Sequence, residues 1–185
     1  MTSAAPYRIR PATLADAPAL RSLIELSVRT LQQHDYTPAQ IEGALGHTLG
    51  LDTQLIADGT YFLAEAIAPS TLPNLAACGG WSFRGTLFGS DNGPGREAAL
   101  LDPATEPARI RAIFVHPSHA RCGLGSLLLS HCEQQAQLAG FTHFSMGSTL
   151  TGVPLYQLRG YRPLETVHVP LPNGEALPVV HMVKP

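Results

Sequence analysis

The chain has 185 residues, of which 44% are hydrophobic and 14% are charged, a composition that supports one folded domain with a sizeable core and excludes an intrinsically disordered protein. The formal net charge is -2, and the sequence has no run of Lys and Arg. A nucleic-acid partner is therefore not expected, because neutralisation of phosphates dominates that kind of binding.

The cysteines and the hydropathy of the sequence indicate in which cellular compartment the protein is expected. The three cysteines, Cys78, Cys122 and Cys132, show no CxxC spacing, so a reducing compartment is a simpler explanation than a disulfide framework or a zinc site. Met1–Arg10 lacks the apolar segment of a signal peptide, and no apolar run approaches the ~18 residues that a membrane span needs. We expect a soluble, cytoplasmic protein with no metal and no membrane partner.

The first half of the chain predicts three strands and two helices. Apolar residues recur at helical spacing from Leu14 to Leu31, after a capping-box-like pair of Thr13 and Asp16. Gly79 and its neighbour indicate a bulge or a close backbone approach within a strand. The expected elements are a strand over Tyr7–Arg10, a helix from Thr13 to about Gln33, a helix that begins at Thr37–Pro38 and ends at Gly46 or Gly50, and strands over Thr60–Ile67 and Leu75–Phe83.

The second half begins with a loop, Arg84–Ala108, that is too long for a plain connection and is therefore either mobile or functional. A C-terminal hairpin turns at Pro172–Gly174. The expected elements are a strand over Arg109–Val115, a helix with an apolar stripe from Leu124 to Ala139 that Gly140 ends, a strand over Phe141–Met146, a short helix over Pro154–Arg159, and strands over Tyr161–Val169 and Ala176–Val183. The order βααββ–loop–βαβαββ predicts one α/β or α+β domain with a mixed sheet.

The turn between the strand that ends at Val115 and the following helix has the composition of a phosphate-binding turn. Gly123 and Gly125 leave the backbone bare at a helix start, where unpaired N–H groups attract phosphate oxygens, and Arg121 could add a charge-assisted bond. The turn lacks the third glycine of a dinucleotide-binding fingerprint and the Gly-Lys-Ser/Thr of a Walker loop. From spacing alone, an ordinary tight turn explains it equally well.

The surrounding segments resemble the GNAT (GCN5-related) N-acetyltransferases. The passages Arg111–Pro117 (RAIFVHP) and Ala120–Leu129 (ARCGLGSLLL) are similar to the family's signature region, whose loop is written Gln/Arg-x-x-Gly-x-Gly/Ala. Ala120 departs from that pattern at its first position. Two further segments are similar to the family's opening and closing motifs: Ile9–Ala12 with Asp16, and the Tyr-x-x-x-Gly-Tyr of Tyr156–Tyr161.

The resemblance implies a single GNAT-like domain over residues 1–185, with a core of about 7–184. It implies a mixed, mostly antiparallel sheet of about seven strands with about four flanking helices. The fourth and fifth strands, Arg109–Val115 and Phe141–Met146, would be splayed apart.

The resemblance also implies acetyl-CoA as co-substrate. Backbone groups of Ile113, Phe114 and Val115 would pair with the pantetheine amides, and one N–H there would polarise the thioester carbonyl. The residues implied to hold the pyrophosphate are Arg121, Cys122, Gly123, Leu124, Gly125 and Ser126.

For catalysis, the resemblance implies direct attack by an amine, with Tyr156 as the general acid that protonates the leaving thiolate. Tyr156 could instead be an ordinary core aromatic. The amine needs a base, and Glu65 is the best carboxylate candidate, followed by His116 and His34. Cys122 is not expected to be a nucleophile, because it has no His or Asp partner in a recognisable arrangement.

The expected activity is transfer of the acetyl group of acetyl-CoA to an amine, either a small molecule or a protein amino group. One alternative is a non-catalytic CoA-binding sensor or partner-binding module of the same fold, and another is a fold without cofactor. The segment Asp35–Tyr36 and the loop Arg84–Ala108 are candidate lids on the acceptor site. The C-terminal hairpin is a candidate homodimer edge.

Overall fold

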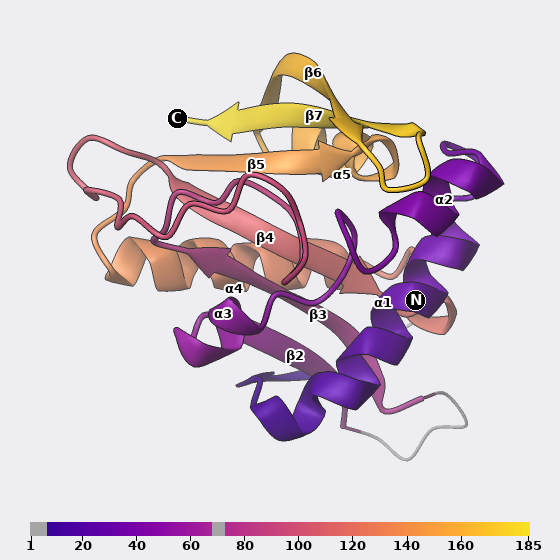
Figure 1. Cartoon of the computed structure of the whole chain (residues 1–185). Coiled ribbons are helices and arrows are strands. Elements are labelled where there is room, and N and C mark those ends of the chain that lie inside the picture. The colour runs from indigo at the N-terminus through magenta and orange to yellow at the C-terminus, as the bar shows by residue number, and fades with distance from the viewer. Residues whose placement is uncertain (1–6, 68–72) are drawn as a thin grey trace.

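The computed structural model describes residues 7–67 and 73–185, and a seven-stranded sheet forms its centre (Figure 1). The strands lie in the order β1-β2-β3-β4-β5-β7-β6. Their bounds are β1 Tyr7–Pro11, β2 Tyr61–Ala66, β3 Leu75–Ser82, β4 Ala108–Val115, β5 Phe144–Thr149, β6 Arg162–Pro170 and β7 Ala176–Lys184.

All neighbouring strands pair antiparallel except β4 and β5, which are parallel. Their pairing covers only two positions, Ala108 with Phe144 and Arg109 with Ser145. Beyond Arg109 the strands diverge, so backbone groups of β4 on that side have no strand partner. The predicted α/β fold with a mixed sheet splayed between the fourth and fifth strands is confirmed.

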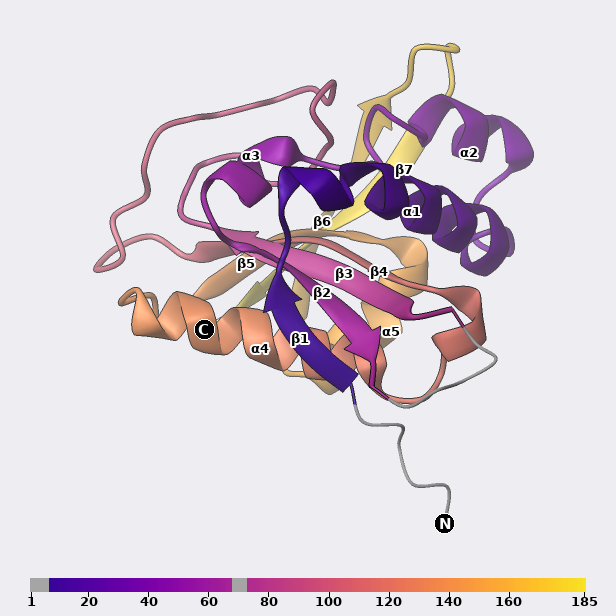
Figure 2. The same cartoon turned by 90° about the horizontal axis from the view of Figure 1, so that it is seen from below.

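In the described part of the chain, five α-helices cover the two faces of the sheet. Their bounds are α1 Ala17–Leu31, α2 Pro38–Ala44, α3 Thr53–Ala57, α4 Leu124–Leu138 and α5 Val153–Leu158. Figure 2 shows α1, α2 and α3 on one side of the sheet and α4 and α5 on the other. No helix among the described residues is both long and apolar enough to cross a membrane.

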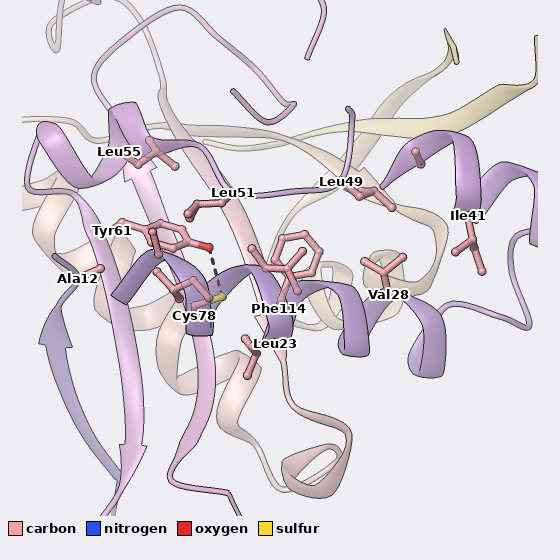
Figure 3. Close-up of a cluster of buried hydrophobic side chains, with 14 of the residues drawn as sticks. Ala12, Leu23, Val28, Ile41, Leu49, Leu51, Leu55, Tyr61, Cys78 and Phe114 are labelled. Atoms are coloured by element: carbon pink, nitrogen blue, oxygen red, sulfur yellow. Dashed lines mark hydrogen bonds between the residues drawn. The ribbon is translucent and has the colours of Figure 1, made fainter. Parts of the chain in front are cut away.

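A hydrophobic core fills the space between α1 and the sheet (Figure 3). Leu20, Leu23 and Val28 of α1 pack there with Phe114 of β4. The burial follows from the helical spacing of those apolar residues. A second core lies under α4, built from Leu124, Leu128, Leu129, Cys132, Phe144 and Met146.

Two expected elements differ from the structure, and one helix is unexpected. The first helix begins with a 3-10 turn, Leu14–Asp16, before α1. The strand expected over Phe141–Met146 runs instead over Phe144–Thr149, and Phe141 is a buried core residue ahead of it. The short helix α3 was not predicted; it begins where the Asp52 carboxylate accepts a hydrogen bond from the Gln54 N–H.

Candidate active site

A bulge in β4 opens the sheet. Ala112 has a positive φ of 51°, and the register between β3 and β4 shifts between Cys78 and Gly80. The buried Tyr61 hydroxyl donates a hydrogen bond to the Ala112 carbonyl at 3.0 Å, which holds the bulge in place. The extra residue bends β4 and breaks its pairing, as bulges do beside functional sites. The bulge expected near Gly79 is confirmed.

A cavity of ≈ 70 Å³ lies where β4 and β5 part. Its lining comes from both hydrophobic cores: Phe114 and Val179 belong to the core under α1, whereas Met146 and Tyr156 belong to the core under α4. The cavity therefore reaches both faces of the sheet. Two molecules that approach from opposite faces could meet inside it.

Tyr156 lies in α5 and lines this cavity, and the residue is only 8% exposed. Its hydroxyl makes no hydrogen bond with any residue that the structure describes. Burial raises the pKa of this phenol well above its usual value, and the nearby Cys132 adds to the shift. The hydroxyl therefore stays protonated at neutral pH, as a proton donor requires.

The long loop after β3 closes the cavity on the α1 side. Leu87, Phe88 and Gly89 line it. The Phe88 ring lies against Gly147 of β5 so closely that a Cβ at Gly147 would come within 2.7 Å of Phe88 Cδ1. Glycine at this position lets the loop approach the sheet. The segment expected to be mobile or functional is thus a wall of the cavity.

A buried cation holds that loop. Arg111 of β4 lines the cavity and pairs with Asp52 at 2.9 Å, and its guanidinium also donates to the carbonyls of Thr86 and Gly89. Desolvation lowers the pKa of Arg111, and the Asp52 carboxylate opposes that shift. Arg96 adds a second contact to Asp52 at 3.1 Å. The sequence could have indicated this pair, because an arginine within a buried strand requires a buried partner.

The glycine turn precedes α4, as expected. Gly123 occupies the N-cap position with φ 83° and ψ 0°, in the left-handed region, and Arg121 is also left-handed at φ 63°. No described side chain caps α4. The first N–H groups of the helix, at Leu124, Gly125 and Ser126, therefore lack helical partners and face outward at the positive end of the helix dipole.

Two contacts fix the turn and place a cation beside it. The buried His119 ring accepts from the Tyr7 hydroxyl at 3.0 Å and donates to the Pro73 carbonyl at 2.9 Å, while the Cys122 thiol donates to the His119 carbonyl. Arg159, just after α5, donates from Nε to the Ser126 hydroxyl at 3.0 Å. Arg159 was missed in the sequence because no spacing rule links it to the turn.

The structure brings Ile113, Phe114 and Tyr156 together around the cavity, and Val115 lies next to the glycine turn. It does not bring Glu65 to that place. Glu65 lies on β2, where Arg8 and Arg10 engage its carboxylate at 2.9 Å and lower its pKa through hydrogen bonds. His116 and His34 do not line the cavity either.

The segment Asp35–Tyr36 is an anchor. The Tyr36 hydroxyl donates to the Pro178 carbonyl at 2.8 Å and accepts from the Leu150 N–H at 2.9 Å. The Asp35 carboxylate accepts from the Thr151 hydroxyl. The connection between α1 and α2 is thereby tied to β7 and to the residues after β5. No cluster of three or more metal-ligating side chains occurs within residues 7–67 and 73–185.

The chain is similar to acetyltransferases in part of its sequence and in its fold. The family model described as an acetyltransferase (GNAT) domain matches residues 99–183. No curated protein sequence matches the chain.

Solved structures of similar fold span the whole chain. The GCN5-related N-acetyltransferase of Rhodopseudomonas palustris has a TM-score of 0.69 at 18% identity and covers 100% of this chain and 98% of its own. The PaiA N-acetyltransferase of Thermoplasma acidophilum, in complex with coenzyme A, has a TM-score of 0.63 at 13% identity, with 97% and 98% covered. The ribosomal-protein-S18-alanine N-acetyltransferase of Escherichia coli has a TM-score of 0.57 at 15% identity, with 97% and 94% covered. At these identities the likeness concerns the fold.

Proposed function

Since the chain belongs to the GNAT family of acetyltransferases, we propose that it transfers the acetyl group of acetyl-CoA directly to an amine. The observation that carries the proposal is the cavity in the splayed sheet, with Tyr156 in its lining, together with the uncapped start of α4. We propose that residues 1–185 form one acyltransferase domain. We also propose that the C-terminal hairpin is the edge of a homodimer, and a monomeric mass in sedimentation would exclude that dimer.

The donor would enter from the α4 side. The N–H groups at the start of α4 and the guanidinium of Arg121 would bind the pyrophosphate. On the side toward β5, where β4 has no strand partner beyond Arg109, the backbone of Ile113–Val115 would hold the pantetheine arm and direct the thioester into the cavity. The Thermoplasma acidophilum neighbour, which has coenzyme A bound, supports a coenzyme A donor for this chain.

Arg159 would add a second charge to the pyrophosphate site through its position beside Ser126. Arg159→Ala should therefore raise the KM for acetyl-CoA by about tenfold. The KM for acetyl-pantetheine, which lacks the phosphates, should not change. An equal rise of the KM for both donors would show that Arg159 does not contact the pyrophosphate.

In the transfer step, the amine nitrogen forms a bond to the acetyl carbon while the carbon–sulfur bond breaks. A backbone N–H of the bulged strand would stabilise the oxyanion, and Tyr156 would give its proton to the departing sulfur. Glu65 is not the base in this step, because its carboxylate pairs with Arg8 and Arg10 and does not line the cavity. The proposal needs no covalent enzyme intermediate.

A second candidate is a CoA-binding sensor that does not catalyse transfer. It is favoured by one observation: among the described residues that line the cavity, none is a carboxylate or a histidine. Incubation with acetyl-CoA and a broad amine panel separates the two. Amine-dependent release of CoA thiol supports the enzyme, whereas acetyl-CoA binding without release from any amine supports the sensor.

A further inference from the structure

One polar residue that lines the cavity has a buried side-chain atom without a partner. The side chain of Gln32 lines the cavity and is 6% exposed, and its Oε1 makes no hydrogen bond with any described residue. Only one other side-chain oxygen or nitrogen that is fully enclosed by protein in the described residues lacks a partner, Nε2 of His131 in α4. Buried polar atoms are rarely left unsatisfied, and an exception commonly marks the place of a ligand or water.

The position of Gln32 is set by its backbone. Gln32 is the C-cap residue of α1, and its N–H bonds to the Val28 carbonyl at 3.2 Å. Its own carbonyl accepts from the N–H groups of Asp35 and Tyr36. Tyr36 is in turn anchored to the sheet by its hydroxyl. The side chain is therefore presented to the cavity from the α1 face by a fixed turn, opposite the face from which the donor would enter.

The charges around the cavity exclude a good site for an ammonium ion. Arg111 and Tyr156 carry the only ionisable side chains that line it in the described chain. Arg111 is a cation whose nearest anion, Asp52, is shared with Arg96. Tyr156 is a neutral phenol. An incoming ammonium would meet a guanidinium and no carboxylate, and desolvation disfavours its charge further.

We propose that Gln32 is the acceptor-binding residue of this cavity, and that the acceptor enters as a neutral, weakly basic amine, such as an α-amino group, in preference to an alkylamine or a lysine side chain. This rests on the proposed acetyl transfer. The Gln32 side chain turns Oε1 toward the cavity as the amine binds, and one N–H of the amine donates to it, which leaves the nitrogen lone pair free for the acetyl carbon. As the C–N bond forms and the C–S bond breaks, the nitrogen loses one proton to a solvent water, and the sulfur gains one from Tyr156, which solvent reprotonates.

The ordinary pKa values of amines set the size of the preference. At pH 7.5, about a quarter of an amine with a pKa near 8 is neutral, compared with about 0.1% of an amine with a pKa near 10.4. If only the neutral form enters, kcat/KM should differ by about 200-fold between the two classes. For the strong base, kcat/KM should rise about tenfold per pH unit between pH 7 and pH 9.

The experiment compares amino-acid amides with alkylamines of equal size in the wild-type protein and in two variants. Gln32→Met removes the hydrogen-bond acceptor at similar volume, and Gln32→Glu replaces the amide with a carboxylate of the same shape. Gln33 is the matched control position, because it is the next residue, the same amino acid, and exposed. Thermal unfolding of each variant verifies that it folds.

Wild type should prefer the amides by about 200-fold at pH 7.5. Gln32→Met should raise the KM for the amides at least tenfold with an unchanged KM for acetyl-CoA, and Gln32→Glu should narrow the preference by favouring alkylamines. Gln33→Met and Gln33→Glu should match wild type. Transfer to alkylamines as fast as to amides, or an unchanged amide KM in Gln32→Met, would overturn the inference and leave acetyl transfer intact. Binding of acetyl-CoA with no transfer to any amine would overturn both.

Discussion

The guanidinium of Arg111 and the carboxylate of Asp52 meet at 2.9 Å, with each side chain only 2% exposed. These residues are 59 positions apart in the chain. Their pair joins β4 to the start of α3 and, through Arg111, to the loop that closes the cavity. The pair therefore connects the sheet to the loop that forms a wall of the cavity.

Asp52→Asn should destabilise the protein by about 3–5 kcal/mol, because it leaves the buried Arg111 cation without its counter-ion while keeping the side-chain shape. Urea unfolding measures the loss. Glu42→Gln is the control, since it breaks an exposed ion pair with Arg29 that should contribute little. Equal stability of Asp52→Asn and wild type would show that the pair does not hold the fold.

Tyr156→Phe should lower kcat by at least about 100-fold with little change in the KM for acetyl-CoA, because it removes only the proton donor. Tyr161→Phe is the matched control: its ring lies 5.9 Å from that of Tyr156, but its hydroxyl donates to Glu133. Steady-state kinetics of both variants decide. A Tyr156→Phe variant with full turnover would remove the acid assignment.

The pH dependence of kcat follows from the raised pKa of Tyr156. A raised pKa keeps the acid form present to higher pH, so kcat at saturating substrates should not fall between pH 8 and pH 10. A phenol with an ordinary pKa of about 10 would already be half ionised at pH 10. A fall of kcat with a midpoint below pH 9 would point to another proton donor.

Gly123→Ala should weaken acetyl-CoA binding at least tenfold, because a side chain in the left-handed region strains the turn that presents the N–H groups of α4. Gly174→Ala is the control. Gly174 has a similar φ of 86° against 83°, and a Cβ at either position would meet nothing within 4 Å. Titration calorimetry with acetyl-CoA should therefore separate two variants of similar strain. Equal affinity of the two variants for acetyl-CoA would show that the turn is not part of the donor site.

Regular elements with strong periodicity could be predicted from the sequence, and the cavity could not. The apolar spacing of α1 and α4 and the glycines of the turn before α4 are local signals, so those predictions hold. The strand β5 was placed three residues too early, because Gly147 and its polar neighbours lack an apolar pattern. Their fit to Phe88 of the loop replaces that pattern in the fold.

The same limit applies to the site. Tyr156 and the glycine turn stand within motifs, whereas Gln32 is an inconspicuous residue at the end of a helix. Gln32 stands out only in the folded structure, where its Oε1 has no hydrogen-bond partner. No spacing rule in the sequence predicts a missing hydrogen bond. Glu65 is a carboxylate on a strand that precedes the fourth strand, and the sequence does not show that two arginines of β1 pair with it.

The most direct test of acetyl transfer is a paired measurement of CoA thiol release and acetylated product by mass spectrometry, with acetyl-CoA and small amino-acid amides. The account predicts that thiol and N-acetylated product form in a one-to-one ratio, and only when both substrates are present. Thiol release that does not depend on the amine, or no product from any amine with a folded protein that binds acetyl-CoA, would contradict it.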